Sequence, residues 1–186
     1  MSKDKFKKMF AISMKYEKGN LINGYVNDPD DAGGETVYGV CRKVFPKLKV
    51  WESLDKLNGV VAKRGYKIPE DEMEEIENVY YRNFYLKCNI DSFNDSALGM
   101  QIFDFAINSG VSRAIKTLQS LMHITVDGIC GVQTVTTANI RHTLSVREEY
   151  RKARLRFYES ISTRGNNKKF LKGWTNRAKT CDKAFI

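Results

Sequence analysis

The sequence predicts a mostly α protein in which one long polar loop interrupts the helices. Over most of the chain, apolar residues recur at intervals of three or four, as on the buried face of a helix. Between Gly19 and Gly39, by contrast, glycine, asparagine and aspartate are too frequent for a helix. With 186 residues, of which 42% are hydrophobic, the chain can form one domain or two lobes that share one core.

The elements are expected in the following order. Residues 4–18 form a first amphipathic helix, and 19–39 form loop, turns and a short hairpin. A long helix runs from Pro69, which suits a first helical turn, to Phe84. Residues 96–108 are apolar almost all round, as in a central buried helix. The remaining helices are predicted over 111–122, from about Gln133, over 145–162 and over 167–182.

The composition excludes several classes of protein and site. No apolar run is long enough to span a membrane or to form a secretory signal, so we expect synthesis in the cytoplasm. The four cysteines and the two histidines, His123 and His142, follow no zinc-site spacing. Buried reduced thiols, helix-end or surface histidines and no metal or organic cofactor are therefore expected. Trp51 and Trp174 are expected to pack in the interior.

The net charge of +9 predicts attraction to polyanions, namely nucleic acid, an anionic membrane or the bacterial cell wall. Charge alone does not choose among them. The basic helix at 145–162 motivates a nucleic-acid alternative, but it lacks a recognised DNA-binding pattern and is more simply explained as a solvated face.

The loop after the first helix carries the clearest chemical signal. Glu17 ends a helix, Asp28, Asp30 and Asp31 lie on the loop, and Thr36 follows. Cleavage of a glycosidic bond needs one protonated carboxyl as acid and a second carboxylate as base or nucleophile. Thr36 would then position a water molecule. The alternative is a solvated glutamate followed by an ordinary turn.

This loop resembles the signature of the glycoside hydrolase family 108 N-acetylmuramidases, which are lysozyme-like enzymes of phages and bacteria that include secretion activators. The matching run is Gly24-Tyr25-Val26-Asn27-Asp28-Pro29-Asp30-Asp31-Ala32-Gly33-Gly34-Glu35-Thr36-Val37-Tyr38-Gly39-Val40. In the family, the glutamate directly precedes Gly-Gly-Tyr, whereas here Lys18 to Asn23 separate Glu17 from Gly24-Tyr25. Such an insertion can bulge outward at little cost, or it can alter the cleft.

The C-terminal half resembles the family's predicted peptidoglycan-binding region. The matching segments are Phe103-Asp104-Phe105-Ala106-Ile107-Asn108-Ser109-Gly110, Thr125-Val126-Asp127-Gly128-Ile129-Cys130-Gly131 and Phe170-Leu171-Lys172-Gly173-Trp174. The resemblance implies a lysozyme-like catalytic region over 1–92 and a helical peptidoglycan-binding region over 93–186.

The resemblance also implies the roles of individual residues. Glu17 is the implied catalytic acid, since no other glutamate lies between Met1 and Glu35. Asp30, which precedes Thr36 by the offset found in phage-type lysozymes, is preferred to Asp31 as second carboxylate. The residues expected to bind substrate are Tyr25, Asn27, Tyr38, Asp104 and Asn108. For both tyrosines the alternative is packing in a core. For Asp104 and Asn108 it is bracing of a loop.

The implied function is hydrolysis of the β-1,4 bond between N-acetylmuramic acid and N-acetylglucosamine. The expected partner is the peptidoglycan glycan strand, with no nucleic acid, no membrane insertion and a monomeric state. The protein would reach the cell wall after holin- or secretion-dependent export, as a phage endolysin or as a bacterial muramidase that opens the wall for secretion. The main alternative is a catalytically silent wall-binding module.

Overall fold

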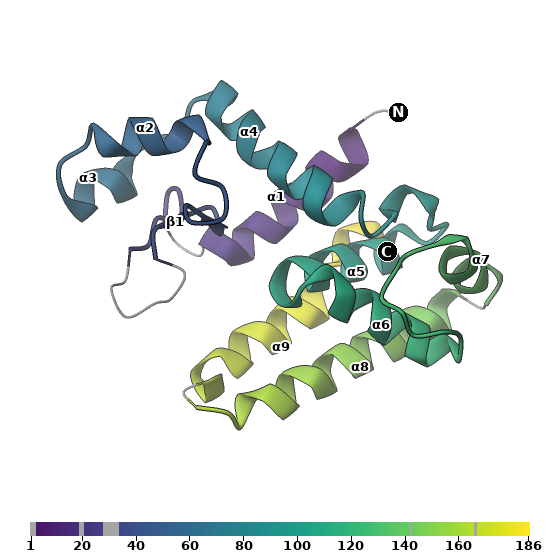
Figure 1. The fold of residues 1–186 in the computed structure, drawn as a ribbon. Helices are drawn as coiled ribbons and strands as arrows, with labels where there is room; N and C mark the ends of the chain where they lie inside the picture. The colour runs from purple at the N-terminus through teal and green to yellow at the C-terminus, as the bar shows by residue number, and fades with distance from the viewer. Residues whose placement is uncertain (1–2, 19–20, 28–33, 142, 166) are drawn as a thin grey trace. The chain divides into compact units, whose positions relative to one another are not determined.

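The structure, a computed structural model, describes residues 3–18, 21–27, 34–141, 143–165 and 167–186. These residues are mostly helical, with one small hairpin among them (Figure 1), so the mostly α prediction is confirmed. The chain divides into two compact units, Met1–Tyr80 and Tyr81–Ile186.

The first unit begins with the helix that the sequence predicts. Its elements are α1 (Asp4–Lys18), β1 (Thr36–Val37), β2 (Val40–Cys41), α2 (Lys49–Asp55), α3 (Gly59–Gly65) and α4 (Glu70–Tyr80). Pro69 immediately precedes α4, and its carbonyl accepts a hydrogen bond from the Met73 amide at 2.9 Å. Helices α2 and α3 are not predicted from the sequence, because each is too short to display a clear amphipathic period.

Aromatic and apolar side chains hold the first unit together. Helix α1 buries Phe6, Met9 and Phe10, and α4 packs against it with the Phe10 and Tyr80 rings 5.3 Å apart. Trp51 on α2 is 1% exposed, and its indole N–H donates to the Phe45 carbonyl at 2.7 Å. The predicted packing role of Trp51 is therefore confirmed.

The second unit is built around a buried central helix. Its elements are a π-helix (Tyr81–Tyr85), α5 (Ser96–Ser109), α6 (Val111–Met122), α7 (Val132–Ile140), α8 (Thr143–Ser162), α9 (Leu171–Thr180) and short 3₁₀ turns (Ile90–Ser92, Asn167–Phe170, Lys183–Phe185). Helix α5 is buried without interruption from Ala97 to Ala106, as predicted, and Asp95 caps it by accepting the Ala97 amide at 2.8 Å. Helices α8 and α9 lie side by side (Figure 1).

The predicted long helix to Phe84 keeps α geometry only as far as Tyr80. It continues as the π-helix.

The histidine and cysteine predictions have mixed outcomes. His123 is exposed and ends α6 with a left-handed φ of 55°, which confirms a helix-end residue. His142 lies outside the described residues. All four cysteines are free thiols, as predicted, but only Cys88 and Cys181 are buried. Trp174 is half-buried and stacks on Tyr158, with the ring centroids 5.4 Å apart.

A buried ion triad joins three helices of the second unit. Asp104 on α5 accepts hydrogen bonds from Arg154 on α8 and from Arg177 on α9, whose Nε lies 2.8 Å from Oδ2. All three side chains are almost wholly buried. Burial alone would raise the pKa of Asp104, but the two guanidinium groups outweigh it and hold the pKa below its ordinary value. The carboxylate therefore stays ionised and ties α5 to α8 and α9.

Replacing Asp104 with asparagine should strongly destabilise the second unit. The substitution leaves two buried guanidinium groups without a counter-charge, which costs about 3–5 kcal/mol of unfolding free energy. Because the folded pKa lies below the unfolded one, the triad stabilises fully above about pH 4 and is lost as the pH falls through the folded pKa. The deficit of the variant should therefore shrink in acid.

The measurement is urea unfolding by circular dichroism at pH 7 and pH 3, with hydrogen exchange to assign the transition to α5, α8 and α9. Glu159→Gln, at an exposed position on α8, serves as the control and should change stability by less than about 0.5 kcal/mol. An Asp104→Asn variant as stable as this control would contradict the stabilising role of the triad.

Candidate active site

A tight hairpin forms the framework of the candidate site in the first unit. Strands β1 and β2 pair antiparallel, with Val37 opposite Val40, and Tyr38 and Gly39 form the two-residue turn. The turn residues have φ values of 48° and 73°, the sign that a type I′ hairpin turn requires at both positions. Asparagine usually fills the first of these positions. A tyrosine there costs free energy, which other contacts must offset.

Hydrogen bonds to its carbonyl and from its amide hold the Tyr38 backbone in this conformation. The Tyr80 hydroxyl on α4 donates to the Tyr38 carbonyl at 2.6 Å, and the Tyr38 amide donates to the Asn23 carbonyl at 2.9 Å. Asn23 is itself buried, and its side-chain amide donates to the Lys63 and Tyr66 carbonyls at 2.8 and 3.0 Å. The turn is therefore held by partners from the preceding loop and from α4.

Glu17 lies against this turn. It sits in the last turn of α1 and is half-buried. A Cβ at position 39 would lie 3.1 Å from the Glu17 Oε2 and 2.7 Å from the Tyr80 hydroxyl oxygen. A glycine is thus needed at position 39 for two reasons, the positive φ and the closeness of these two oxygens. The result is a carboxyl group on a rigid helix, held beside a hydroxyl and a backbone turn.

A second carboxylate nearby, Glu35, has a different role. Its Oε1 accepts from the Tyr25 hydroxyl at 2.7 Å and the Lys63 ammonium at 3.2 Å, and its Oε2 from Arg42 at 2.8 Å. Burial would raise the pKa of Glu35, but the bonds from Arg42, Tyr25 and Lys63 outweigh it and lower the pKa. Glu35 is therefore an ionised anchor of the hairpin and is poorly suited to donate a proton.

The other predicted site residues of the first unit have varied positions. Thr36 is half-buried on β1, where its amide and carbonyl bond to Val26 at 2.8 and 3.0 Å. Tyr38 is half-buried in the turn, and Asn27 is exposed. Asp30 lies outside the described residues.

Tyr25 has no ring face open to a sugar in this structure. It is only 1% exposed, it donates its hydroxyl proton to Glu35, and the Lys63 ammonium lies 5.6 Å from the centre of its ring. These surroundings fit the alternative for this residue, which is packing in the core. Tyr25 is therefore not among the residues that we propose to contact the substrate.

Asp104 and Asn108 belong to the second unit and lie in different surroundings. Asp104 is fully buried, and both of its oxygens are engaged by arginines in the triad. A sugar contact would require this triad to open, so bracing fits Asp104 better than substrate binding. Asn108 is half-buried, and its Oδ1 accepts from Ser109 at 3.2 Å.

Sequence reasoning missed two residues that position the site, Tyr80 and Asn23. Tyr80 lies on the apolar stripe of α4, where it is indistinguishable from a packing residue. The available signal was its hydroxyl, since a buried tyrosine usually finds a hydrogen-bond partner. For Asn23, nothing in the sequence distinguishes it from the other loop asparagines.

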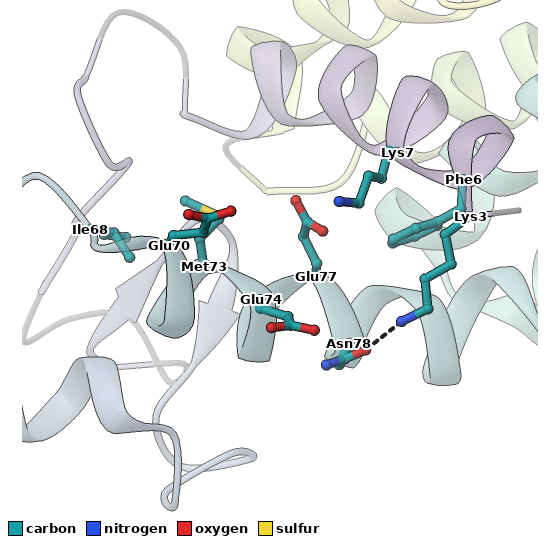
Figure 2. A pocket seen from close by; sticks show the side chains of 9 residues that line it. All are labelled: Lys3, Phe6, Lys7, Ile68, Glu70, Met73, Glu74, Glu77 and Asn78. Atoms are coloured by element: carbon teal, nitrogen blue, oxygen red, sulfur yellow. Dashed lines mark hydrogen bonds between the residues drawn. The ribbon is translucent and has the colours of Figure 1, made fainter.

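A separate hollow lies between the start of α1 and the length of α4 (Figure 2). Its volume is about 460 Å³, and Lys3, Lys7, Glu74 and Glu77 contribute charges of both signs to its lining. The Lys3 ammonium donates to Asn78 Oδ1 at 3.3 Å. None of the predicted site residues lines this hollow, so it is not the candidate active site.

The described part of the chain offers no candidate metal site and no candidate membrane-spanning helix. No group of three or more histidine, cysteine, aspartate or glutamate residues in the described part of the chain is arranged to hold a metal ion. Among the helices described, none is both long enough and apolar enough to cross a bilayer.

Comparisons with known proteins relate this chain to a known family. Residues 15–110 match the family model described as glycosyl hydrolase 108, and residues 113–179 match one described as a predicted peptidoglycan domain. The structure is similar to that of Brucella abortus SagA, with 26% sequence identity, 96% of each chain covered and a TM-score of 0.67. No curated protein matches the sequence significantly.

The fold and these matches define a glycoside hydrolase with a mostly α, lysozyme-like fold. The chain belongs to the glycosyl hydrolase 108 family. Together with the C-terminal peptidoglycan domain, this indicates a hydrolase that acts on peptidoglycan, and hence at the cell wall.

The domain boundary expected between residues 92 and 93 stays a prediction. The compact units divide after Tyr80, whereas the two family matches divide between residues 110 and 113.

Substituting Gly39 with alanine should disrupt the candidate site. The new methyl group would approach the Tyr80 and Glu17 oxygens at 2.7 and 3.1 Å, and the positive φ adds strain of about 1–2 kcal/mol. We expect a loss of stability of at least that size and a large drop in hydrolysis of purified peptidoglycan.

The control is Gly65→Ala in α3, where nothing lies within 4 Å of the added carbon and φ is not positive. This variant should retain wild-type activity and stability. If Gly39→Ala behaved in the same way, the turn would not be what positions Glu17.

Proposed function

We propose that this protein is an N-acetylmuramidase in which Glu17 is the general acid. It cleaves the β-1,4 bond between N-acetylmuramic acid and N-acetylglucosamine, and Glu17 protonates the leaving oxygen. The observation that carries the proposal is the position of the Glu17 carboxyl, against the Tyr38–Gly39 turn and beside the Tyr80 hydroxyl. Glu17 also lies within the segment that matches the glycosyl hydrolase 108 family.

The local structure supports a proton donor at this position. General acid catalysis requires the carboxyl group to be held within hydrogen-bond reach of the leaving oxygen. The last turn of α1 limits where Glu17 can reach, and the hairpin turn limits it from the other side. Glu35, beside the hairpin, is engaged by Arg42, Lys63 and Tyr25 and is poorly suited to donate a proton.

The second carboxylate in the proposal is Asp30, with Thr36 positioning a water molecule. Cleavage in either stereochemical course needs a second carboxylate across the sugar ring from the acid. The backbone of Thr36 is paired on both sides, to Val26 and to β2, which fixes the residue in place. Its side-chain hydroxyl is the group proposed to hold the water molecule. The half-buried Tyr38 ring is the proposed stacking surface for a sugar, and Asn27 a further contact.

The proposed site of action is the bacterial cell wall. The net charge of +9 favours encounter with this anionic polymer. Two settings fit the proposal: a phage endolysin that passes through a holin, and a bacterial muramidase that opens the wall for secretion. The protein is proposed to act as a monomer.

The primary test is release of reducing sugar ends from purified peptidoglycan by the wild type and by Glu17→Gln. The glutamine variant keeps the shape of the side chain but has no acidic proton, so we expect activity about 10²–10⁴-fold lower. Mass spectrometry should find muramic acid at the new reducing end. Glu52→Gln, at an exposed position on α2, is the control and should remain fully active.

Each other outcome has a definite meaning. Equal activity of the wild type and Glu17→Gln would refute Glu17 as the acid. New ends on glucosamine would refute muramidase specificity. A folded wild type that binds cell walls without releasing sugar ends would establish the silent binding module instead.

The choice of second carboxylate has its own matched test. Asp30→Asn should lower the rate of sugar-end release about 10²-fold or more, whereas Asp31→Asn should leave it within a few-fold of wild type. Both variants change the net charge equally, so general attraction to the wall is held constant. The reverse pattern would assign the role to Asp31.

A further inference from the structure

A basic groove lies in the second unit, between α6 and α8. Its volume is about 390 Å³. Three cationic side chains contribute to its lining, Arg113 and Lys116 from α6 and Arg156 from α8. The aromatic ring of Phe157 and the exposed side chain of Val126 also line the groove.

The three cations are available to a ligand. Each of them is exposed, and no carboxylate lines the groove in the part of the chain that the structure describes. In that part of the chain, no ion pair engages Arg113, Lys116 or Arg156. By contrast, Arg151 of the same helix is paired with Glu148 and Asp182. The groove therefore gathers three cationic side chains with no carboxylate in its described lining, and Asp127 interacts electrostatically with Lys116 from outside that lining.

The Arg113 side of the groove is pre-organised. Its guanidinium lies over the Phe157 ring, 5.2 Å from the centroid, which limits the conformations open to both side chains. The Arg113 carbonyl in turn accepts from the Thr117 hydroxyl at 2.9 Å. An arginine held against an aromatic ring loses less freedom when it binds a carboxylate.

The turn around Gly128 packs against Lys116, another residue of the lining. Gly128 has a φ of 83°, and a Cβ there would lie 3.0 Å from Lys116 Cε, so the lysine stem packs directly over this glycine. The Gln119 side chain holds the turn, because it donates to Asp127 Oδ1 at 2.7 Å and accepts from the Gly128 amide at 2.9 Å. Asp127 interacts electrostatically with Lys116, and its Oδ1 also accepts the Ile129 amide at 2.8 Å. The Thr125–Gly131 motif thus supports Lys116 and Val126 at the groove.

We propose that this groove binds the carboxylate-bearing stem peptide of peptidoglycan, separately from the glycan bound at the catalytic site. The proposal rests on peptidoglycan being the substrate. A stem peptide carries several carboxylates and small alanine methyl groups along a short chain. The cations match the carboxylates, and Val126, Leu121 and Ala153 offer apolar surface for the methyl groups.

A phosphate polymer such as DNA fits the groove less well. Such a polymer binds through extended rows of cations along its backbone, whereas these three cations surround a small hollow. Apolar lining would contribute little to recognition of phosphates.

The experiment is titration of the full-length protein with the isolated, sugar-free stem tetrapeptide, followed by calorimetry and by NMR shifts of Val126 and Phe157. The wild type should bind the tetrapeptide, and the double variant Arg113→Gln/Arg156→Gln should bind about tenfold more weakly or worse. A tetrapeptide with amidated carboxyl groups should lose most of its affinity.

The matched control is Lys172→Gln/Lys179→Gln, which removes the same charge from exposed positions on α9. It should bind the tetrapeptide like the wild type. Equal weakening by both double variants would overturn the proposal in favour of general charge attraction. Absence of binding by a folded wild type would overturn it too, as would tighter binding of duplex DNA to the same residues.

The readout is independent of catalysis, because the probe contains no glycosidic bond. Repeating the titration with Glu17→Gln should give the same affinity. A chain that binds the peptide but releases no sugar ends would refute the proposed muramidase activity alone, and the reverse result would refute only the groove.

Discussion

At the centre of the candidate site is the hydrogen bond from the Tyr80 hydroxyl to the Tyr38 carbonyl. It links α4 to a hairpin turn whose first residue is a tyrosine in a left-handed conformation, which is unfavourable by itself. The same turn brings Gly39 against the Glu17 carboxyl at the end of α1. Strain in the backbone is thus offset by tertiary contacts, and the carboxyl is placed by three segments that are distant in the sequence.

Carboxylates of this protein are used in two contrasting ways. Asp104 and Glu35 are surrounded by cations or donors that lower their pKa, and both act as ionised anchors of packing. Glu17 lies at the end of α1, against the Tyr38–Gly39 turn and beside the Tyr80 hydroxyl. It is the carboxyl group proposed to donate a proton.

The cationic side chains of the second unit likewise lie in two kinds of surroundings. Arg154 and Arg177 are buried and form ion pairs with Asp104, so they contribute to the packing of α5, α8 and α9. Arg113, Lys116 and Arg156 remain exposed around the groove between α6 and α8. The net charge alone predicts attraction to an anionic polymer. Only the positions of the charges distinguish cations that stabilise the fold from those that can meet a ligand.

The sequence by itself determined most of the helices, the hairpin and the family. Periodicity located α1, α5 and α6 closely, because amphipathic pattern and turn residues act over a few positions along the chain. It did not reveal α2 and α3, which are too short to show a period, or the change to a π-helix at Tyr81. The surroundings of Tyr25, Tyr80 and Asp104 were decided only by the tertiary structure. A tyrosine or aspartate looks the same in sequence whether it faces substrate or a buried partner, and only the partners brought near by folding settle which role it can take.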